Sequence, residues 1–121
     1  MSLTVFITGA TSGIGKATAE FLAQHNYRLI LCGRNKEQLQ NLEKSLGKQT
    51  DLITLQFYVR NKNDVFNSIE SLPEDFRNID VLINNAWNAH GLSYIQDGDT
   101  NDWDAMLDIN VKGLLLSLIH I

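Results

Sequence analysis

The chain has 121 residues, of which 44% are hydrophobic and 20% are charged, a composition typical of one folded domain and not of a multidomain protein. A net charge of −4 gives no electrostatic reason to expect a nucleic-acid partner. The single cysteine excludes an internal disulfide and a four-cysteine zinc site, and it favours a reducing, cytoplasmic location. No apolar run reaches the roughly 20 residues of a membrane-spanning helix, so we expect no membrane partner.

Short apolar runs alternate along the chain with helical patterns. Runs of β-branched and aromatic residues predict strands at residues 3–7, 27–32, 52–57 and 80–83. Apolar residues spaced three and four apart predict helices near 14–23, 39–46, 65–72 and 100–111. This alternation is typical of βαβ units, so the sequence predicts an α/β fold with a doubly wound parallel sheet and helices on both faces.

Several residues are predicted to serve the fold rather than chemistry. We expect Thr100 to cap the last helix. The buried face of that helix would carry Trp103, Met106, Leu107 and Val111. Cys32 lies in a predicted strand and is interpreted as a buried small hydrophobe. Neither the histidines nor the acidic residues of 97–104 have the spacing of metal ligands, so no metal site is predicted.

Three glycines lie in the turn between the first predicted strand and the first predicted helix. In a doubly wound sheet this turn faces the ligand side, and the free N–H groups of a helix N-terminus attract phosphate. The residues predicted to bind a dinucleotide here are Gly9, Thr11, Ser12, Gly13, Ile14 and Gly15. A P-loop is excluded because five residues, not four, separate Gly9 from Gly15. The alternative is a structural turn that binds no ligand.

The end of the second predicted strand indicates which dinucleotide the chain binds. An acidic residue at this point would bond the ribose 2′-hydroxyl of NAD, whereas an arginine would pair with the 2′-phosphate of NADP. The chain has Gly33-Arg34 here and no acid. We therefore predict NADP as the cofactor, with Arg34 at its 2′-phosphate. The alternative is a solvated surface arginine.

Three motifs together resemble those of the classical short-chain dehydrogenases/reductases. Residues 8–15 are similar to the cofactor motif of that family, and Asn84-Asn85-Ala86 is similar to the start of its Asn-Asn-Ala-Gly motif. The segment 108–113 is similar to the one that carries the family's helix asparagine. The resemblance implies a Rossmann-type sheet with strand order 3-2-1-4. The stretches 71–80 and 102–103 are similar to the branch that oxidises 3-hydroxy acids and serine-like substrates with NADP.

The resemblance also implies roles for individual residues. Asn84 and Ala86 would line the adenosine and ribose side of the cofactor. Asn110 would be the catalytic asparagine, which helps to hold a water in a proton relay. The implied activity is hydride transfer between NADP(H) and a hydroxyl or carbonyl group of a small-molecule substrate, such as a 3-hydroxy acid. In this family a Tyr handles the proton and a Lys lowers the pKa of that Tyr.

The Ser, Tyr and Lys of the family do not occur in their motif in these 121 residues. Tyr58 and Lys62 have the Tyr-x3-Lys spacing, but they span a strand end and a loop, so Tyr58 is not predicted to be catalytic. We expect a single truncated dinucleotide-binding domain over residues 1–121, whose tail at 116–121 does not resemble the family. A homo-oligomer is expected only for a full-length form. The alternative is a non-catalytic dinucleotide-binding module.

Two positions depart from the motifs of the family. Tyr58 stands near the place where an Asp usually meets the adenine amino group, and Trp87 stands where the family has a glycine. A Trp adopts a positive φ less readily than Gly and would crowd the nicotinamide ribose. Both departures predict weak binding of NADP.

Overall fold

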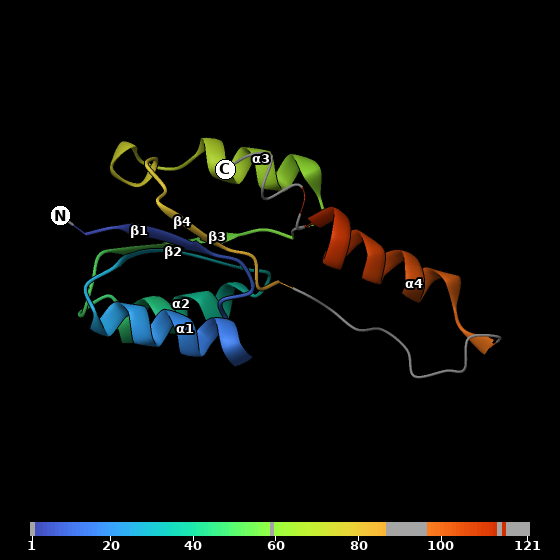
Figure 1. Ribbon diagram of the computed structural model, residues 1–121, viewed down its shortest axis with the longest axis horizontal. Coiled ribbons are helices and arrows are strands. Elements are labelled where there is room, and N and C mark those ends of the chain that lie inside the picture. The colour runs from blue at the N-terminus through green and yellow to red at the C-terminus, as the bar shows by residue number, and fades with distance from the viewer. Residues whose placement is uncertain (1, 59, 87–96, 114, 116–121) are drawn as a thin grey trace.

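The computed structural model describes residues 2–58, 60–86, 97–113 and 115, which form a sheet with helices on both faces (Figure 1). The strands are β1 (Thr4–Ile7), β2 (Arg28–Gly33), β3 (Leu52–Gln56) and β4 (Val81–Ile83). The helices are α1 (Gly13–Gln24), α2 (Lys36–Leu46), α3 (Lys62–Glu70) and α4 (Thr100–Leu107). A 3-10 turn at Glu74–Phe76 precedes β4, and a π-helical segment at Asp108–Gly113 continues α4.

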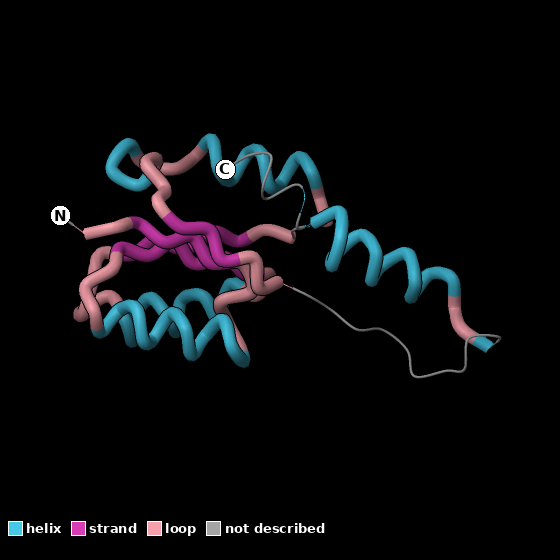
Figure 2. The backbone as a smooth tube through the Cα atoms, in the orientation of Figure 1, coloured by secondary structure: helices cyan, strands magenta, loops and turns pink. Residues whose placement is uncertain are grey.

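The four strands are parallel and lie in the order β3-β2-β1-β4. Helices α1 and α2 cover one face of this sheet, and α3 covers the other (Figure 2). Strand order and layers confirm the predicted Rossmann-type α/β sheet with order 3-2-1-4. Because all strands point the same way, the segments that follow β1, β2, β3 and β4 meet at one edge of the sheet.

Successive side chains of the central strands point alternately into two separate hydrophobic cores, one on each face of the sheet. Val5 and Ile7 of β1 point toward α1 and α2, whereas Phe6 between them points toward α3. The first core also contains Ala19, Ala23, Leu29, Leu31, Leu42 and Leu46. The second core also contains Ile30, Cys32, Val65 and Ile109. Burial on both faces explains why β1 and β2 read as continuous apolar runs rather than alternating ones.

The cap of α4 differs from the prediction. Asp99 is the N-cap residue, and its side chain accepts a hydrogen bond from the backbone N–H of Asn101 at 2.8 Å. Thr100 is the first residue of the helix, so its predicted role as the cap is wrong. The physical reason is local: the carbonyl of Asp99 already accepts from the N–H groups of Asp102 and Trp103, so the helical turn starts one residue earlier.

The predicted buried face of α4 is also wrong. Trp103, Leu107 and Val111 are 40%, 61% and 52% exposed, and the buried residues are Ala105 and Ile109. Helix α4 extends past the edge of the sheet, so only part of it can reach the second core (Figure 1). The side chain of Met106, the fourth residue of the predicted face, lies outside the described residues.

Candidate functional site

A cleft of about 510 Å³ lies at the edge of the sheet where the strands end. Its walls come from the turn after β1, the ends of β2 and β3, the segment after β4 and the π-helical segment. The lining residues are Gly9, Thr11, Ser12, Gly13, Ile14, Cys32, Gly33, Arg34, Phe57, Tyr58, Asn85, Ala86 and Ile109. The structure therefore brings together all the predicted cofactor-binding residues except Gly15 and Asn84.

The N-terminus of α1 faces this cleft without a capping side chain. Its N-cap residue, Ser12, makes no side-chain cap bond, and the first turn of α1 holds no acidic residue. By contrast, α2, α3 and α4 are capped by the side chains of Asn35, Asn61 and Asp99, and each has an acid in its first turn. The first N–H groups of α1 and the positive end of its dipole are thus left for an external anion.

The three glycines of the turn are required for two different reasons. Gly9 and Gly13 have φ values of +64° and +56°, in the left-handed region that residues other than glycine adopt only at a cost in free energy. Gly15 is required by space: a Cβ there would lie 2.2 Å from the carbonyl oxygen of Gly9 and 2.4 Å from Nδ2 of Asn85. The absence of a side chain at Gly15 therefore lets α1 pack against the turn.

A buried threonine ties the segment after β4 to the end of β1. The Thr8 hydroxyl oxygen accepts hydrogen bonds from the backbone N–H groups of Asn85 and Ala86, both at 3.0 Å. In return, Nδ2 of Asn85 donates to the carbonyl oxygen of Gly9 at 3.0 Å. Sequence reasoning missed both Thr8 and Asn85 as site residues. Their position in the sequence could have indicated this bridge. Thr8 follows β1 and Asn85 follows β4, and the predicted strand order makes these two strands neighbours.

The two predicted asparagines lie beside the cleft and not on its wall. The side-chain oxygen of Asn84 is buried and has no hydrogen-bond partner among the described residues. Asn110 is half-buried and lies in the π-helical segment, next to Ile109, which does line the cleft. π-Helical turns inside α-helices are frequent at functional sites, and here the turn carries the residue predicted to be catalytic.

Arg34 stands at the mouth of the cleft on an aromatic ring. Its guanidinium carbon lies 4.9 Å from the centre of the Tyr58 ring. The next arginine along the chain, Arg60, donates from its Nε to a carboxylate oxygen of Asp108 at 2.8 Å. The pKa of Arg60 is raised, first by its hydrogen bond with the Tyr58 side chain and then by Asp108. Tyr58 follows β3 and Lys62 opens α3, so the two do not share a helix face.

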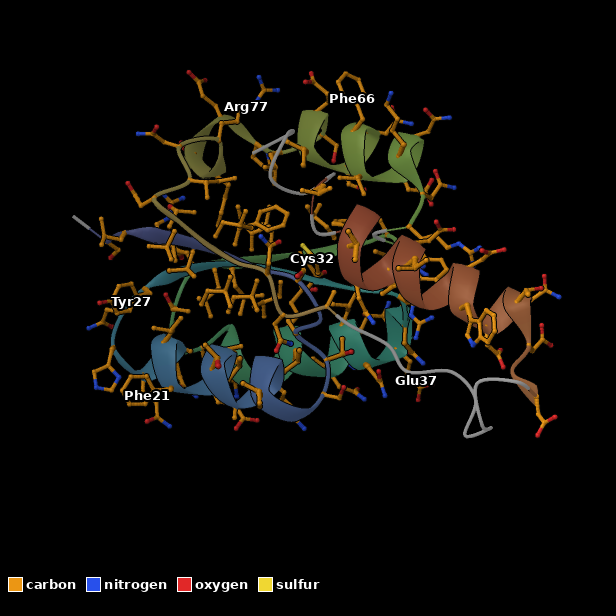
Figure 3. The ribbon with its side chains drawn as sticks, turned by 45° about the vertical axis from the view of Figure 1, so that its right-hand side comes forward. Phe21, Tyr27, Cys32, Glu37, Phe66 and Arg77 are labelled. Atoms are coloured by element: carbon orange, nitrogen blue, oxygen red, sulfur yellow. The ribbon has the colours of Figure 1, made fainter. Side chains whose placement is uncertain are left out.

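Cys32 lies in the middle of the molecule, between the layers (Figure 3). Only 1% of it is exposed, which confirms the predicted buried hydrophobe. Burial raises the pKa of the thiol well above its ordinary value, so it is no nucleophile at neutral pH.

The described residues hold no metal-binding group of His, Cys, Asp or Glu side chains, and none of their helices has the length and apolar character to cross a bilayer. Trp87, His90 and His120 lie outside the described residues.

Comparison with known proteins identifies the family. The sequence profile described as short chain dehydrogenase matches residues 3–119. The chain belongs to the short-chain dehydrogenases. It is 43% identical over 115 residues to sulfoacetaldehyde reductase 2 of Chromohalobacter salexigens, covering 95% of this chain and 46% of that protein. It is 40% identical over 111 residues to the NADP-dependent 3-hydroxy acid dehydrogenase YdfG of Salmonella typhi, covering 92% of this chain and 44% of that protein.

Solved structures of the family agree with this assignment. A closed form of serine dehydrogenase complexed with NADP+ superposes with a TM-score of 0.88 at 35% identity, over 97% of this chain and 46% of that chain. The resemblance inferred from the three motifs is confirmed. The chain spans about half the length of these short-chain dehydrogenases.

Proposed function

We propose that this chain is the dinucleotide-binding part of an NADP-dependent oxidoreductase. The reaction is hydride transfer between NADP(H) and a hydroxyl or carbonyl carbon of a small-molecule substrate, such as a 3-hydroxy acid. One observation carries the proposal: the uncapped N-terminus of α1 and the guanidinium of Arg34 line the same cleft. The name of the YdfG relative and the ligand of the serine dehydrogenase structure support NADP.

The residues of the cleft fit a dinucleotide. Apart from its own helix backbone and chain neighbours, no atom of the described residues lies within 4 Å of where a Cβ of Gly13 would stand, so a pyrophosphate can approach the start of α1. The hydroxyl groups of Thr11 and Ser12 supply further donors on the same wall. Arg34 would hold the 2′-phosphate, which is separated from the pyrophosphate by the adenosine ribose. When bound, NADP supplies or accepts the hydride, and the protein binds and orients it.

The remaining assignments concern the substrate side of the site. Asn110 is proposed to help hold a water that relays the proton. We propose that residues 1–121 form one domain that binds the dinucleotide without turning over a substrate. This is supported by the separation of Tyr58 and Lys62 onto a loop and the start of α3, which leaves no Tyr-x3-Lys pair on one helix. By itself the chain would then act as a binding module.

The test is a calorimetric titration with NADP+ and NAD+. The parent chain is expected to bind NADP+ more tightly than NAD+. Arg34→Leu is expected to lower the affinity for NADP+ about 10- to 100-fold, the effect of losing charge-assisted hydrogen bonds, and to leave NAD+ binding unchanged. Arg77→Leu is the matched control, because Arg77 lies away from the cleft and donates hydrogen bonds to the carbonyl oxygens of Leu72 and Glu70 (Figure 3).

Three results would contradict the proposal. Equal affinities of the parent chain for the two dinucleotides would remove the preference for NADP. An equal loss of NADP+ affinity in Arg34→Leu and Arg77→Leu would show that the charge of Arg34 acts only through the overall field of the protein. Formation of NADPH from NADP+ and a 3-hydroxy acid by the purified chain would contradict the binding-only role.

A further inference from the structure

Tyr58 and Arg34 lie together at the mouth of the cleft. The face of the Tyr58 ring lies against the guanidinium of Arg34, whose carbon is 4.9 Å from the ring centre, and Arg60 follows two residues later in the chain. Arg60 is in turn fixed by Asp108 at 2.8 Å. The register of β2 and β3, which pairs Gly33 with Gln56, brings the segments of Arg34 and Tyr58 side by side. The face of the Tyr58 ring therefore supports Arg34.

Arg60 and Arg34 differ in whether a carboxylate of the protein pairs with their charge. In the described part of the chain, the only ion pair joins Arg60 to Asp108, so the charge of Arg60 has a partner within the protein. Arg34 has no such carboxylate among the described residues. Asp64 lines an adjoining groove of about 450 Å³ with Arg34 and Tyr58, but forms no ion pair with Arg34. The charge of Arg34 is thus left for a ligand.

We propose that Tyr58 is a specificity-determining residue, which holds Arg34 on its ring so that an adenosine with a 2′-phosphate is preferred over one with a 2′-hydroxyl. An aromatic face positions a guanidinium without neutralising it. An arginine already held in place loses less side-chain entropy on binding. The inference deepens the proposed function and rests on it.

The experiment measures the ratio of NADP+ to NAD+ affinity by calorimetry in the full chain. Tyr58→Leu removes the ring and is expected to lower the ratio about 2- to 5-fold, the size of an exposed cation–π contribution. Tyr58→Phe keeps the ring and is expected to stay within about twofold of the parent. Tyr58→Asp also removes the ring and is expected to lower the ratio by at least as much as Tyr58→Leu. Tyr27→Leu, at the end of the sheet away from α4, is the matched control and leaves the ratio unchanged (Figure 3).

Arg34→Leu separates a failure of this inference from a failure of the proposed function. If Arg34→Leu abolishes the preference but Tyr58→Leu leaves the ratio at the parent value, the role of Tyr58 is wrong and the proposed function stands. If the parent chain shows no preference, the proposed function fails and this inference fails with it. A loss in Tyr58→Phe as large as in Tyr58→Leu would also overturn the role of the ring. Circular dichroism checks that each variant folds, and if Tyr58→Leu does not, Tyr58→Phe and Tyr58→Asp decide between these outcomes.

Discussion

For Gly15→Ala, helix propensity and the structure predict changes in stability of opposite sign. Gly15 lies in the first turn of α1, and replacing a helical glycine by alanine normally stabilises a helix by about 1 kcal/mol. In this structure the new Cβ would lie 2.2 Å from the carbonyl oxygen of Gly9, which is backbone and cannot rotate away. It would also lie 2.4 Å from Nδ2 of Asn85, the atom that donates to that same carbonyl.

The magnitude follows from these contacts. Overpacking against backbone costs about 1 to 3 kcal/mol, and loss of the bond from Asn85 to Gly9 costs about 1 kcal/mol more. Helix propensity offsets about 1 kcal/mol of this. Gly15→Ala is therefore expected to lower the free energy of unfolding by about 1 to 3 kcal/mol. Urea unfolding followed by circular dichroism measures it, with an unchanged dependence on denaturant showing that the folded state is otherwise intact.

Ala17→Gly is the matched control for this prediction. Ala17 is exposed on the same helix, so its change to glycine reports propensity alone and is expected to cost about 1 kcal/mol. A Gly15→Ala chain that is more stable than the parent by about the amount lost in Ala17→Gly would refute the close packing of α1 against the turn.

Two further predictions concern buried groups beside the cleft. Thr8→Val removes the acceptor of the Ala86 N–H and one of the two acceptors of the Asn85 N–H, which keeps the carbonyl of Ile83, and it is expected to cost about 2 kcal/mol in urea unfolding. Thr18→Val, which removes only a bond to the carbonyl of Ile14 within α1, is the control, and equal losses would show that the Thr8 bridge is unimportant. Burial raises the pKa of Cys32 above its ordinary 9.0, so the folded chain keeps a proton that the unfolded chain loses. Stability should therefore fall as pH rises above about 9, and less so in Cys32→Ala; the same pH dependence in both chains would contradict the burial of the thiol.

The sequence predicted those features that depend on local chemistry. Continuous apolar strands alternating with helices specify a doubly wound sheet, and the left-handed turns at Gly9 and Gly13 require glycine. The bridge from Thr8 to Asn85 was missed because it joins residues that only the pairing of β1 with β4 brings together. The weak NADP binding expected from Tyr58 and Trp87 stays a prediction.

The last helix shows a second limit of sequence reasoning. An amphipathic pattern predicts that a helix has an apolar face, but it does not say whether anything in the chain covers that face. Helix α4 extends beyond the edge of the sheet (Figure 1), and Trp103, Leu107 and Val111, on α4 and its continuation, are exposed. Ile109, which the pattern did not single out, is the residue that enters the core and lines the cleft.

The central claim is that the turn after β1 and the end of β2 hold one NADP molecule. A titration of the ¹⁵N-labelled chain with NADP+, followed by amide resonances, tests it most directly. We predict that the amide resonances of Gly9, Gly13 and Ile14 shift with either NADP+ or NAD+, and that the resonance of Arg34 shifts with NADP+ alone. Shifts confined to the groove at the opposite edge of the sheet, around Arg28 and Lys48, would contradict the account, as would the absence of any shift.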